Sequence, residues 1–392
     1  MNVKNLSIYV LTAILFVSLS SHSATAGELD TLLRNLKSTN STVRKKAADS
    51  LDKYVNKSNA NEKIVPALLK VLNKDDDSLV RLYSARTLSK VKDKSIADSF
   101  KSIIDNPNSN AHAAVVDVFP TIDTNEKDLY LVKALSSKDI RARKKAADHL
   151  SQFSKSNPDV QTALINSLKN DDDSLVRLYA ARSLKKTEGI DIVPIFISAM
   201  KGKGASQVAD VVEGIQDKRL EQPLIDLLKH KDDNTRKNAV IALSDSFIKG
   251  NSKVENLLIS LLKNDDDSLV QLYSFRGLTK VYSKDMISLF NESLSKKFIA
   301  REVADFLEKK GDLSSLPNLI KLLGTDSNSA RVAAVAAIRK IIDRNKDATS
   351  IDQLRNCLPN LGEATYSKST KDVALFFDIF LGGFGLFSAS AE

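Results

Sequence analysis

The sequence is poor in the residues on which disulfides, metal sites and aromatic-rich sites depend. Among 392 residues there is one cysteine, Cys357, there is no tryptophan, and histidine occurs only four times. A single cysteine excludes a disulfide within the chain. Glycine and proline number only 13 and 8, which favours helices over sheets and turn-rich folds.

Recognisable catalytic motifs are also missing. After residue 26 the only histidines are His112, His149 and His230, and none has a second ligand three or four residues away. We find no glycine-rich phosphate loop, nucleophile elbow or paired-carboxylate motif. No base lies near Cys357 in the sequence, so we expect it to be buried like an apolar residue. We therefore predict a protein that is not an enzyme, without catalytic residues, metal or cofactor.

Residues 1–26 have the pattern of a secretory signal peptide. Lys4 supplies a positive charge, 6–19 is apolar, and Ala24-Thr25-Ala26 forms a cleavage site before Gly27. The apolar run is shorter than the roughly 20 residues that a spanning helix needs. No cysteine follows it, which argues against a lipoprotein. We predict export to the periplasm or the cell exterior, with a mature chain that begins at Gly27.

A twelve-residue segment, Asp75 to Arg86, occurs three times. It returns as Asp171 to Arg182, starting 96 residues later, and as Asp265 to Arg276, starting 94 residues after that. Gln271 replaces the arginine of the first two copies, and Phe275 replaces an alanine. Self-similarity at a fixed period is the signature of a repeat protein.

A shorter period lies inside this long one. The pattern V-R-x-x-A-A-x-x-L recurs about every 32 residues, and an apolar run of helical spacing precedes each copy. Each repeat is therefore predicted to be two helices, A and then B, joined by a polar turn. The reference positions in helix B are 44, 81, 112, 143, 177, 208, 236, 271, 300 and 331. The prediction is an all-α fold, an α-solenoid of about ten helical hairpins.

The repeat pattern sets the expected domain boundaries. We predict a signal peptide over 1–26, a solenoid over 27–345, a degenerate capping hairpin over 346–381 and a Gly/Phe/Ser tail over 382–392. Three phenylalanines of the predicted cap would close the last core, since repeat arrays need a terminal element. Alternatively, 373–387 anchors the chain to a membrane surface or a partner. The phenylalanines are Phe376, Phe377 and Phe380.

The B-helix pattern resembles the HEAT-like repeats of the phycobilisome-lyase type, over about residues 28–343. The resemblance rests on Asp, Val, Arg, Ala and Leu at fixed offsets, as in Asp77, Val80, Arg81, Ala85 and Leu88. The chain departs from the family at Asn40 and Gln271, and three repeats lack the arginine. The resemblance implies an interaction scaffold, and in a minority of relatives a subunit of a chromophore lyase.

One row of side chains is predicted to point away from the core. If Val80 is set at zero and each residue turns about 100°, Arg86 falls near 240°, Lys90 near 280° and Tyr83 near 300°. Tyr and Arg are enriched at binding hot spots, so we predict a binding surface on the B helices. The alternative is a structural role. The tyrosine would then pack between neighbouring helices, and the three copies would be alike because the segment was duplicated. The nine candidate residues are Tyr83, Arg86, Lys90, Tyr179, Arg182, Lys186, Tyr273, Arg276 and Lys280.

Two other arginines, Arg81 and Arg177, fall near 100° on this scale, on the side of the helix that packs against the core. They therefore need hydrogen-bonding partners. We expect each to pair with an aspartate of its own or an adjacent turn. The same aspartate triplets could suggest a cation site, but calcium loops alternate their ligands and need a glycine, so capping explains the triplets better. A structural role is thus predicted for Asp77, Arg81, Asp173 and Arg177.

The net charge and the predicted export together limit the classes of partner that we expect. The net charge is +9, and lysine is spread over every repeat instead of forming a nucleic-acid patch. We expect a protein partner with an acidic surface, peripheral contact with a membrane or cell-surface polymer as a further possibility, and no nucleic acid. The predicted function is an exported, non-catalytic protein-binding scaffold. The alternatives are lyase activity and an envelope structural protein or adhesin.

Overall fold

The computed structural model describes residues 27–57, 60–106, 108–154, 157–187 and 189–345. Within these residues every regular element is helical and there is no strand. A first helix over 27–35 pairs with α2, and the later helices pair in order up to α20, giving ten hairpins. The predicted all-α solenoid of ten hairpins is confirmed. The predicted signal peptide, capping hairpin, tail and Cys357 lie outside the described residues.

The chain divides into two compact units, which are described separately. The described part of unit 1 runs from 27 to 211. Its helices after the first are α2 (Ser41–Ser50), α3 (Ala60–Lys74), α4 (Ser78–Leu88), α5 (Lys94–Asp105), α6 (His112–Val118), α7 (Lys127–Ala134), α8 (Ile140–His149), α9 (Pro158–Asn170), α10 (Ser174–Lys185), α11 (Ile192–Met200) and α12 (Ala205–Val211).

Unit 2 begins at Val212, and its described part ends at 345. Its helices are α13 (Glu221–Leu227), α14 (Asp233–Ser246), α15 (Ser252–Asn264), α16 (Ser268–Thr279), α17 (Ile287–Ser293), α18 (Ala300–Lys310), α19 (Leu316–Leu323) and α20 (Asn328–Arg344). Short 3-10 helices lie at the turns of both units: η1 (Leu51–Tyr54), η2 (Phe119–Thr121), η3 (Leu150–Gln152), η4 (Lys218–Leu220), η5 (Lys284–Met286) and η6 (Leu313–Ser315).

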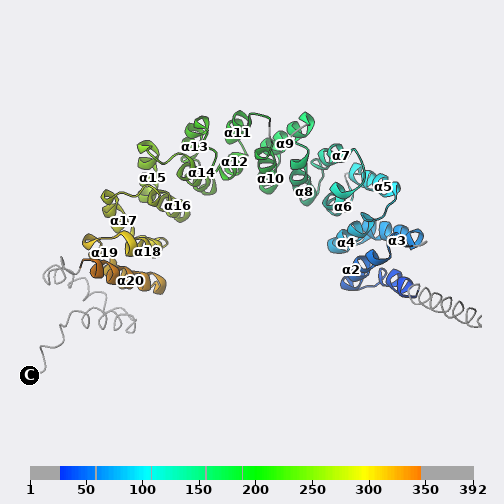
Figure 1. Ribbon diagram of the computed structural model, residues 1–392, viewed down its shortest axis with the longest axis horizontal. Helices are drawn as coiled ribbons and strands as arrows, with labels where there is room; N and C mark the ends of the chain where they lie inside the picture. The colour runs from blue at the N-terminus through cyan, green and yellow to red at the C-terminus, as the bar shows by residue number, and fades with distance from the viewer. Residues whose placement is uncertain (1–26, 58–59, 107, 155–156, 188, 346–392) are drawn as a thin grey trace, which may run out of the picture. The chain divides into compact units, whose positions relative to one another are not determined.

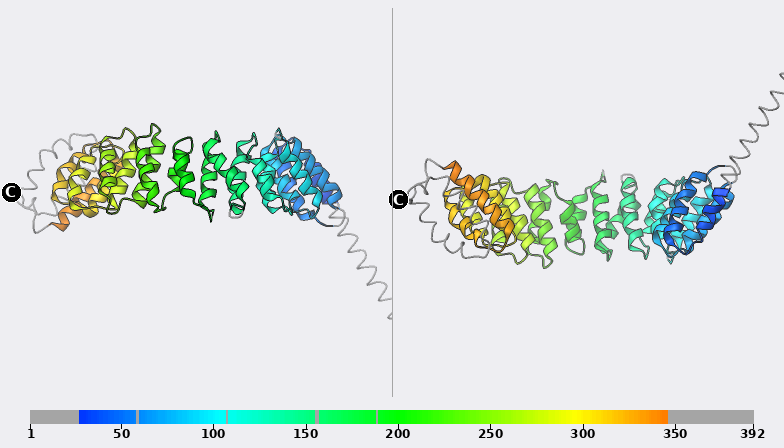
Figure 2. Two further views of the ribbon diagram at one scale, coloured as in Figure 1. Left: turned by 90° about the horizontal axis from the view of Figure 1, so that it is seen from above. Right: turned by 90° about the horizontal axis from the view of Figure 1, so that it is seen from below.

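Each unit has two layers of helices. In unit 1 the B helices α2, α4, α6, α8, α10 and α12 contact one another in sequence, and the A helices α5, α7, α9 and α11 do the same on the other side (Figure 1). In unit 2, α14 packs on α16 and α18 on α20, while α17 packs on α19. Figure 2 shows that the helices of each unit lie side by side across the direction of stacking.

The B helices begin where the sequence places a capping aspartate. Asp77 and Asp173 have extended backbone conformations, and each side chain accepts the amides of the residues two and three positions later. These bonds satisfy donors that the first turn of a helix leaves unpaired. The following valine and leucine, Val80 and Leu88 in α4, are fully buried between the layers. Burial of such side chains stabilises a hairpin only when its neighbours are present, which is why the units are stacks.

The third copy of the long repeat carries an aromatic cluster in place of an alanine contact. Phe275 lies 5.0 Å from Phe290 and 5.9 Å from Phe306, measured between ring centroids and in edge-on geometry. Tyr282 completes the cluster, 5.3 Å from Phe306. The cluster links α16 to α17 and α18.

In the described residues no helix is long and apolar enough to cross a membrane.

Candidate functional site

The predicted binding row on α4 lies at the surface of the B-helix layer. The side chains of Arg86 and Lys90 are 50% and 59% exposed, and Tyr83 is half-buried. The Arg86 guanidinium carbon lies 5.7 Å from the centre of the Tyr83 ring, and Lys45 Nζ from α2 lies 5.9 Å from it. Cations at these distances from an aromatic face are attracted to it. The ring thus joins two neighbouring B helices and keeps part of its face at the surface.

The same arrangement recurs in the later copies. On α10 the Arg182 guanidinium carbon is 5.9 Å from the Tyr179 ring centre, and Lys144 Nζ from α8 is 5.7 Å from it. On α16 the Arg276 guanidinium carbon is 5.0 Å from the Tyr273 ring centre. The tyrosine and arginine predicted from the sequence therefore lie together in all three copies.

The next repeat supplies an acidic partner to each of these arginines. Arg86 donates to Asp117 at 3.2 Å and Arg182 to Asp210 at 3.5 Å. Arg276 donates two hydrogen bonds to the Glu302 carboxylate, at 2.6 and 3.0 Å. Sequence reasoning missed these acids, because they lie 26 to 31 residues away in the repeats that lack the arginine. The surface therefore alternates cations with carboxylates and is less basic than its own row suggests.

The lysines of the row are also placed by neighbouring helices. Lys90 forms an ion pair with Asp52 at 2.6 Å, and Lys280 forms an ion pair with Asp245. In both pairs the aspartate belongs to the helical hairpin that comes before the hairpin of the lysine. Lys186 has no ion partner among the described residues. Ion pairs as exposed as these are each worth less than about 1 kcal/mol, so a partner can displace them at low cost.

An apolar side chain extends the row at the helix N-terminus. Leu79, Leu175 and Leu269 are 49%, 49% and 47% exposed, although they are large and apolar. Each leucine lies four and seven residues before its tyrosine and arginine, which places these three on one face of the helix. The lysine follows eleven residues after the leucine, just beyond the end of the helix. We call these residues the Leu–Tyr–Arg–Lys strip, which has three separate copies: Leu79, Tyr83, Arg86 and Lys90, and the corresponding residues of α10 and α16. The first two copies lie in unit 1 and the third lies in unit 2.

Asp117 has the most constrained carboxylate of the strip. Burial alone would raise its pKa, but hydrogen bonds and charge from Lys145 and then Arg86 lower the pKa below its ordinary value. Lys145 comes from α8 and Arg86 from α4, so one carboxylate links three consecutive B helices through ion pairs. It thereby connects Arg86 of the first copy to the helix two repeats further on.

A second set of arginines joins repeats inside the stack. Arg44 donates from Nε and Nη2 to the Asp75 carboxylate at 2.6 and 2.9 Å, and Asp75 is the first residue of the aspartate triplet. The hydrogen bond and charge of Asp75 raise the pKa of Arg44 against the effect of burial. The equivalent pairs are Arg143 with Asp171 and Arg236 with Asp265. The triplet thus uses its first aspartate to bind the previous repeat and its third to cap its own helix.

Arg81 and Arg177 each bind an aspartate of their own turn, but through its main chain. Arg81 donates to the main-chain carbonyl of Asp75, and Arg177 donates to that of Asp171 at 2.7 Å. The accepting group is thus a carbonyl and not a carboxylate. Every residue carries a carbonyl, so the sequence gives no signal for this choice. Gln271 replaces the arginine in the third copy and donates to the Asp265 carbonyl.

The histidines and carboxylates form no metal site in the described part of the chain. His112 is buried, with its ring nitrogens 2.5 Å from the Ser137 hydroxyl and 2.8 Å from the Ile103 carbonyl. Across the described ranges no group of three or more His, Cys, Asp or Glu side chains is placed to hold a metal ion. His112 therefore acts as a core residue with both nitrogens satisfied.

Comparisons with known proteins agree with this geometry. The sequence profile of HEAT repeats matches residues 29–118 and 192–279, so these two stretches are HEAT repeats. No curated protein matches the chain. The stacked A and B layers define an α-solenoid, and over these two stretches its hairpins match the HEAT-repeat profile.

A karyopherin structure shows the same fold. The karyopherin Kap121p bound to the extreme C-terminus of the protein phosphatase Cdc14p is 14% identical, with a TM-score of 0.50, over 92% of this chain and 46% of that one. A homology model of the full-length AP-3 complex in an intermediate open conformation is also similar, at 14% identity and a TM-score of 0.48 over 92% and 72% of the two chains. This chain therefore spans less than half the length of the karyopherin.

Proposed function

We propose that this chain is an exported protein-binding scaffold, and that its partner binds along the Leu–Tyr–Arg–Lys strip. The observation that carries the proposal is the three-fold recurrence of an exposed leucine beside a tyrosine and an arginine. A half-exposed leucine by itself needs no explanation, but three equivalent ones next to aromatic and cationic groups make a composite surface. Tyr and Arg are the residues that contribute most to binding at protein interfaces.

The strip indicates the chemistry of the partner. The leucine and the tyrosine face offer apolar contact, while the arginine and lysine offer charge-assisted hydrogen bonds to carboxylates. A partner with alternating apolar and acidic side chains matches both. Such a partner would have to displace Asp117, Asp210 and Glu302 from the strip arginines. A cluster of several carboxylates on the partner can do this better than a single carboxylate. Repetition of the strip suits a partner that offers several such clusters, since multivalent contact raises affinity.

Export is the second part of the proposal. It is supported by the leader-like pattern of 1–26, with an A-x-A site before Gly27. The prediction is that the chain isolated from the cell exterior or periplasm begins at Gly27, and that Ala26→Arg prevents this cleavage. N-terminal sequencing of the exported chain measures it. An uncleaved chain found only in the cytoplasm would remove the export claim and leave the binding claim intact.

Two other functions stay as alternatives. Lyase activity is suggested only by the resemblance of the repeats, and an envelope structural role or adhesion only by export. No feature of the described residues favours either over protein binding. The scaffold function is proposed because the strip offers it a specific surface.

Reversal of the strip charges tests the binding claim. The triple variant Arg86→Glu, Arg182→Glu and Arg276→Glu should lose the partner captured from the envelope or extracellular fraction by the mature chain. A matched control makes the same charge change on the A-helix side, at Lys70, Lys201 and Lys229, which are exposed. The control should keep the partner. If both variants or neither lose it, the strip is not the binding surface.

A further inference from the structure

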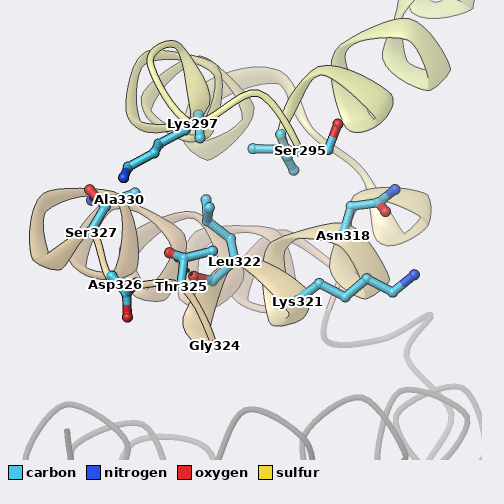
Figure 3. A pocket seen from close by; sticks show the side chains of 12 residues that line it. Ser295, Lys297, Asn318, Lys321, Leu322, Gly324, Thr325, Asp326, Ser327 and Ala330 are labelled. Carbon is cyan, nitrogen blue, oxygen red and sulfur yellow. Dashed lines mark hydrogen bonds between the residues drawn. The ribbon is translucent and has the colours of Figure 1, made fainter. Parts of the chain in front are cut away.

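A pocket of about 380 Å³ opens in unit 2, between the turn that precedes α18 and the turn that precedes α20. Its apolar lining comes from four side chains that are at most 4% exposed: Leu294, Ala300, Leu322 and Ala330. Figure 3 shows the pocket between the two turns. Its volume is within the range of about 300–1,000 Å³ that small binding pockets occupy.

The rim of the pocket is polar and mainly positive. Lys297 and Lys321 extend from opposite sides of it, and Asp326 is the one acidic residue of the lining (Figure 3). Both lysines are exposed, and neither has an ion partner among the described residues. Arg276 of the same unit, by contrast, is paired with Glu302. The pocket therefore combines an apolar floor with two unpaired cations.

Phe298 is the neighbour in sequence of Lys297, which lines the pocket. Its side chain is 80% exposed, more than any other large apolar side chain of the described residues. It follows Lys297 in the turn before α18, and it occupies the position that Leu269 has in the preceding repeat. A single exposed apolar side chain needs no explanation by itself. Phe298 matters here because its chain neighbour Lys297 lines an apolar pocket, so that the phenylalanine and this part of the pocket wall belong to the same turn.

We propose that this pocket and Phe298 form a second docking site, distinct from the strip, for a peptide segment of a partner protein. The segment carries a bulky apolar side chain flanked by acidic residues. The apolar side chain enters the pocket, a neighbouring apolar group covers Phe298, and the flanking carboxylates meet Lys297 and Lys321. Charge complementarity at the rim and the size of the pocket select this occupant.

A membrane surface fits the same residues less well. Polybasic segments that bind anionic lipid headgroups use clusters of about four to eight lysines or arginines. Here two lysines share the rim with Asp326. A single pocket of this size also suits one side chain of a peptide better than the many acyl chains of a bilayer. The inference goes beyond the strip, and it stands or falls independently of it.

Peptide display tests the proposal. A library of random twelve-residue peptides is selected on the intact mature chain, and enriched peptides are measured by fluorescence polarisation. We expect sequences with one large apolar residue between acidic ones. Phe298→Ser, and separately Lys297→Glu with Lys321→Glu, should weaken their binding about tenfold or more, as truncation of a hot-spot residue does.

Matched controls lie on the next helix. Val332→Ser removes another exposed apolar side chain, 55% exposed on α20, and Lys340→Glu reverses an exposed charge there. Both should leave affinity within about twofold, and circular dichroism should show that every variant stays folded. Failure to enrich any peptide, enrichment of peptides without the pattern, or equal binding by Phe298→Ser would each overturn the proposal.

Two further arms separate the other occupants. The strip variant with three reversed arginines should bind the peptide normally; loss there, with binding kept in Phe298→Ser, would assign the peptide to the strip instead. The chain's own Phe-rich segment is the other candidate. If Phe376→Ser, Phe377→Ser and Phe380→Ser made together strengthen peptide binding several-fold, that segment occupies the pocket and the partner proposal is wrong. We expect the triple phenylalanine variant to bind the selected peptide with unchanged affinity.

Discussion

Arg143 binds the carboxylate of Asp171 across the boundary between two repeats, through Nε at 2.8 Å and Nη2 at 3.1 Å. The same guanidinium donates to the Ser137 carbonyl at 2.9 Å, in the turn before its own helix. Arg177 then donates to the Asp171 carbonyl and, through Nε, to Gln207 at 3.2 Å. This chain of contacts crosses three consecutive hairpins, so it holds the register of the stack as well as its stability.

Loss of this arginine should destabilise unit 1. The side chains of Arg143 and Asp171 are only 16% and 8% exposed, so Arg143→Ala leaves a nearly buried carboxylate without its cation. We expect a loss of roughly 2–3 kcal/mol, somewhat below the value for fully buried pairs. Arg143→Lys should recover only part of it, because a lysine cannot form the two-point contact. Urea unfolding followed by circular dichroism measures both.

Arg141 is the matched control for this variant. It lies on the same helix and pairs with Asp139, but its side chain is 55% exposed. Arg141→Ala should cost less than about 1 kcal/mol. Equal losses at the two positions would mean that the contact between repeats contributes nothing special.

A glycine in α16 marks a close approach between B helices. A Cβ at Gly277 would lie 2.2 Å from Ser244 Oγ and 3.0 Å from Leu258 Cδ1. The equivalent Thr87 and Ser183 have room to donate to Ala48 and Ala147 carbonyls, both at 2.7 Å. Although glycine to alanine usually favours a helix, Gly277→Ala should destabilise unit 2 by about 1–3 kcal/mol through overpacking.

A double-mutant cycle identifies the cause. Ser244→Ala removes the nearest atom, so in that background Gly277→Ala should cost at least about 1 kcal/mol less. Thermal and urea unfolding of the four proteins give the coupling. Additive effects of the two substitutions would show that Ser244 is not the obstacle.

Stability should fall in acid because several carboxylates are charged in the folded state. The amide of Val80 lowers the pKa of Asp77, against burial, and the amide of Ser95 lowers that of Asp93. Lys145 and Arg86 outweigh burial at Asp117 in the same direction. A lowered folded-state pKa gives stability that is present above the unfolded value of about 3.9 and is lost as the pH falls below it.

The urea midpoint should therefore stay level from pH 7 to about 5 and drop steeply below about pH 4. Asparagine also caps helices but does not titrate, so Asp77→Asn with Asp93→Asn should make the drop shallower. An acid profile identical to that of the unmodified chain would show that these caps do not control it.

The acids that hold the strip arginines should limit binding of an acidic partner. Glu302 holds Arg276 with two short bonds, and its hydrogen bond and charge raise the pKa of Arg276 despite burial. Asp210 holds Arg182 with one long bond. Glu302→Gln should therefore raise partner affinity by about threefold, and Asp210→Asn by less, since exposed pairs are worth below about 1 kcal/mol. Titration calorimetry measures both, and weaker binding in either variant would mean that the acids themselves contact the partner.

The fold was predictable from the sequence because each repeat carries the same apolar and arginine positions. Ten hairpins and the exposed face of α4 follow from spacing alone. The acidic partners were harder to find, since Asp117 lies five residues after the reference position of its repeat while Asp210 and Glu302 lie two after theirs, in three divergent repeats. Arg44, Arg143 and Arg236 are each followed by an aspartate 28 to 31 residues later, and this spacing was a usable signal for the buried pairs.

The exposed leucines of the strip could have been predicted from the sequence. With Val80 on the packed side, Leu79 falls near 260°, beside Arg86 near 240°, so the spacing already places it at the surface. Main-chain acceptors such as the Asp75 carbonyl remain invisible to any residue-type pattern, because their availability depends on the turn that the backbone makes.

Site-specific photo-crosslinking tests the central claim most directly, namely that a protein partner binds the Leu–Tyr–Arg–Lys strip. A photoreactive phenylalanine analogue is placed at Tyr83, Tyr179 or Tyr273, or at Leu129 on the A-helix side, which is 49% exposed. We expect the same partner protein to be crosslinked from the tyrosine positions and not from Leu129. Crosslinks that form only from Leu129, or equally from all four positions, would contradict the account.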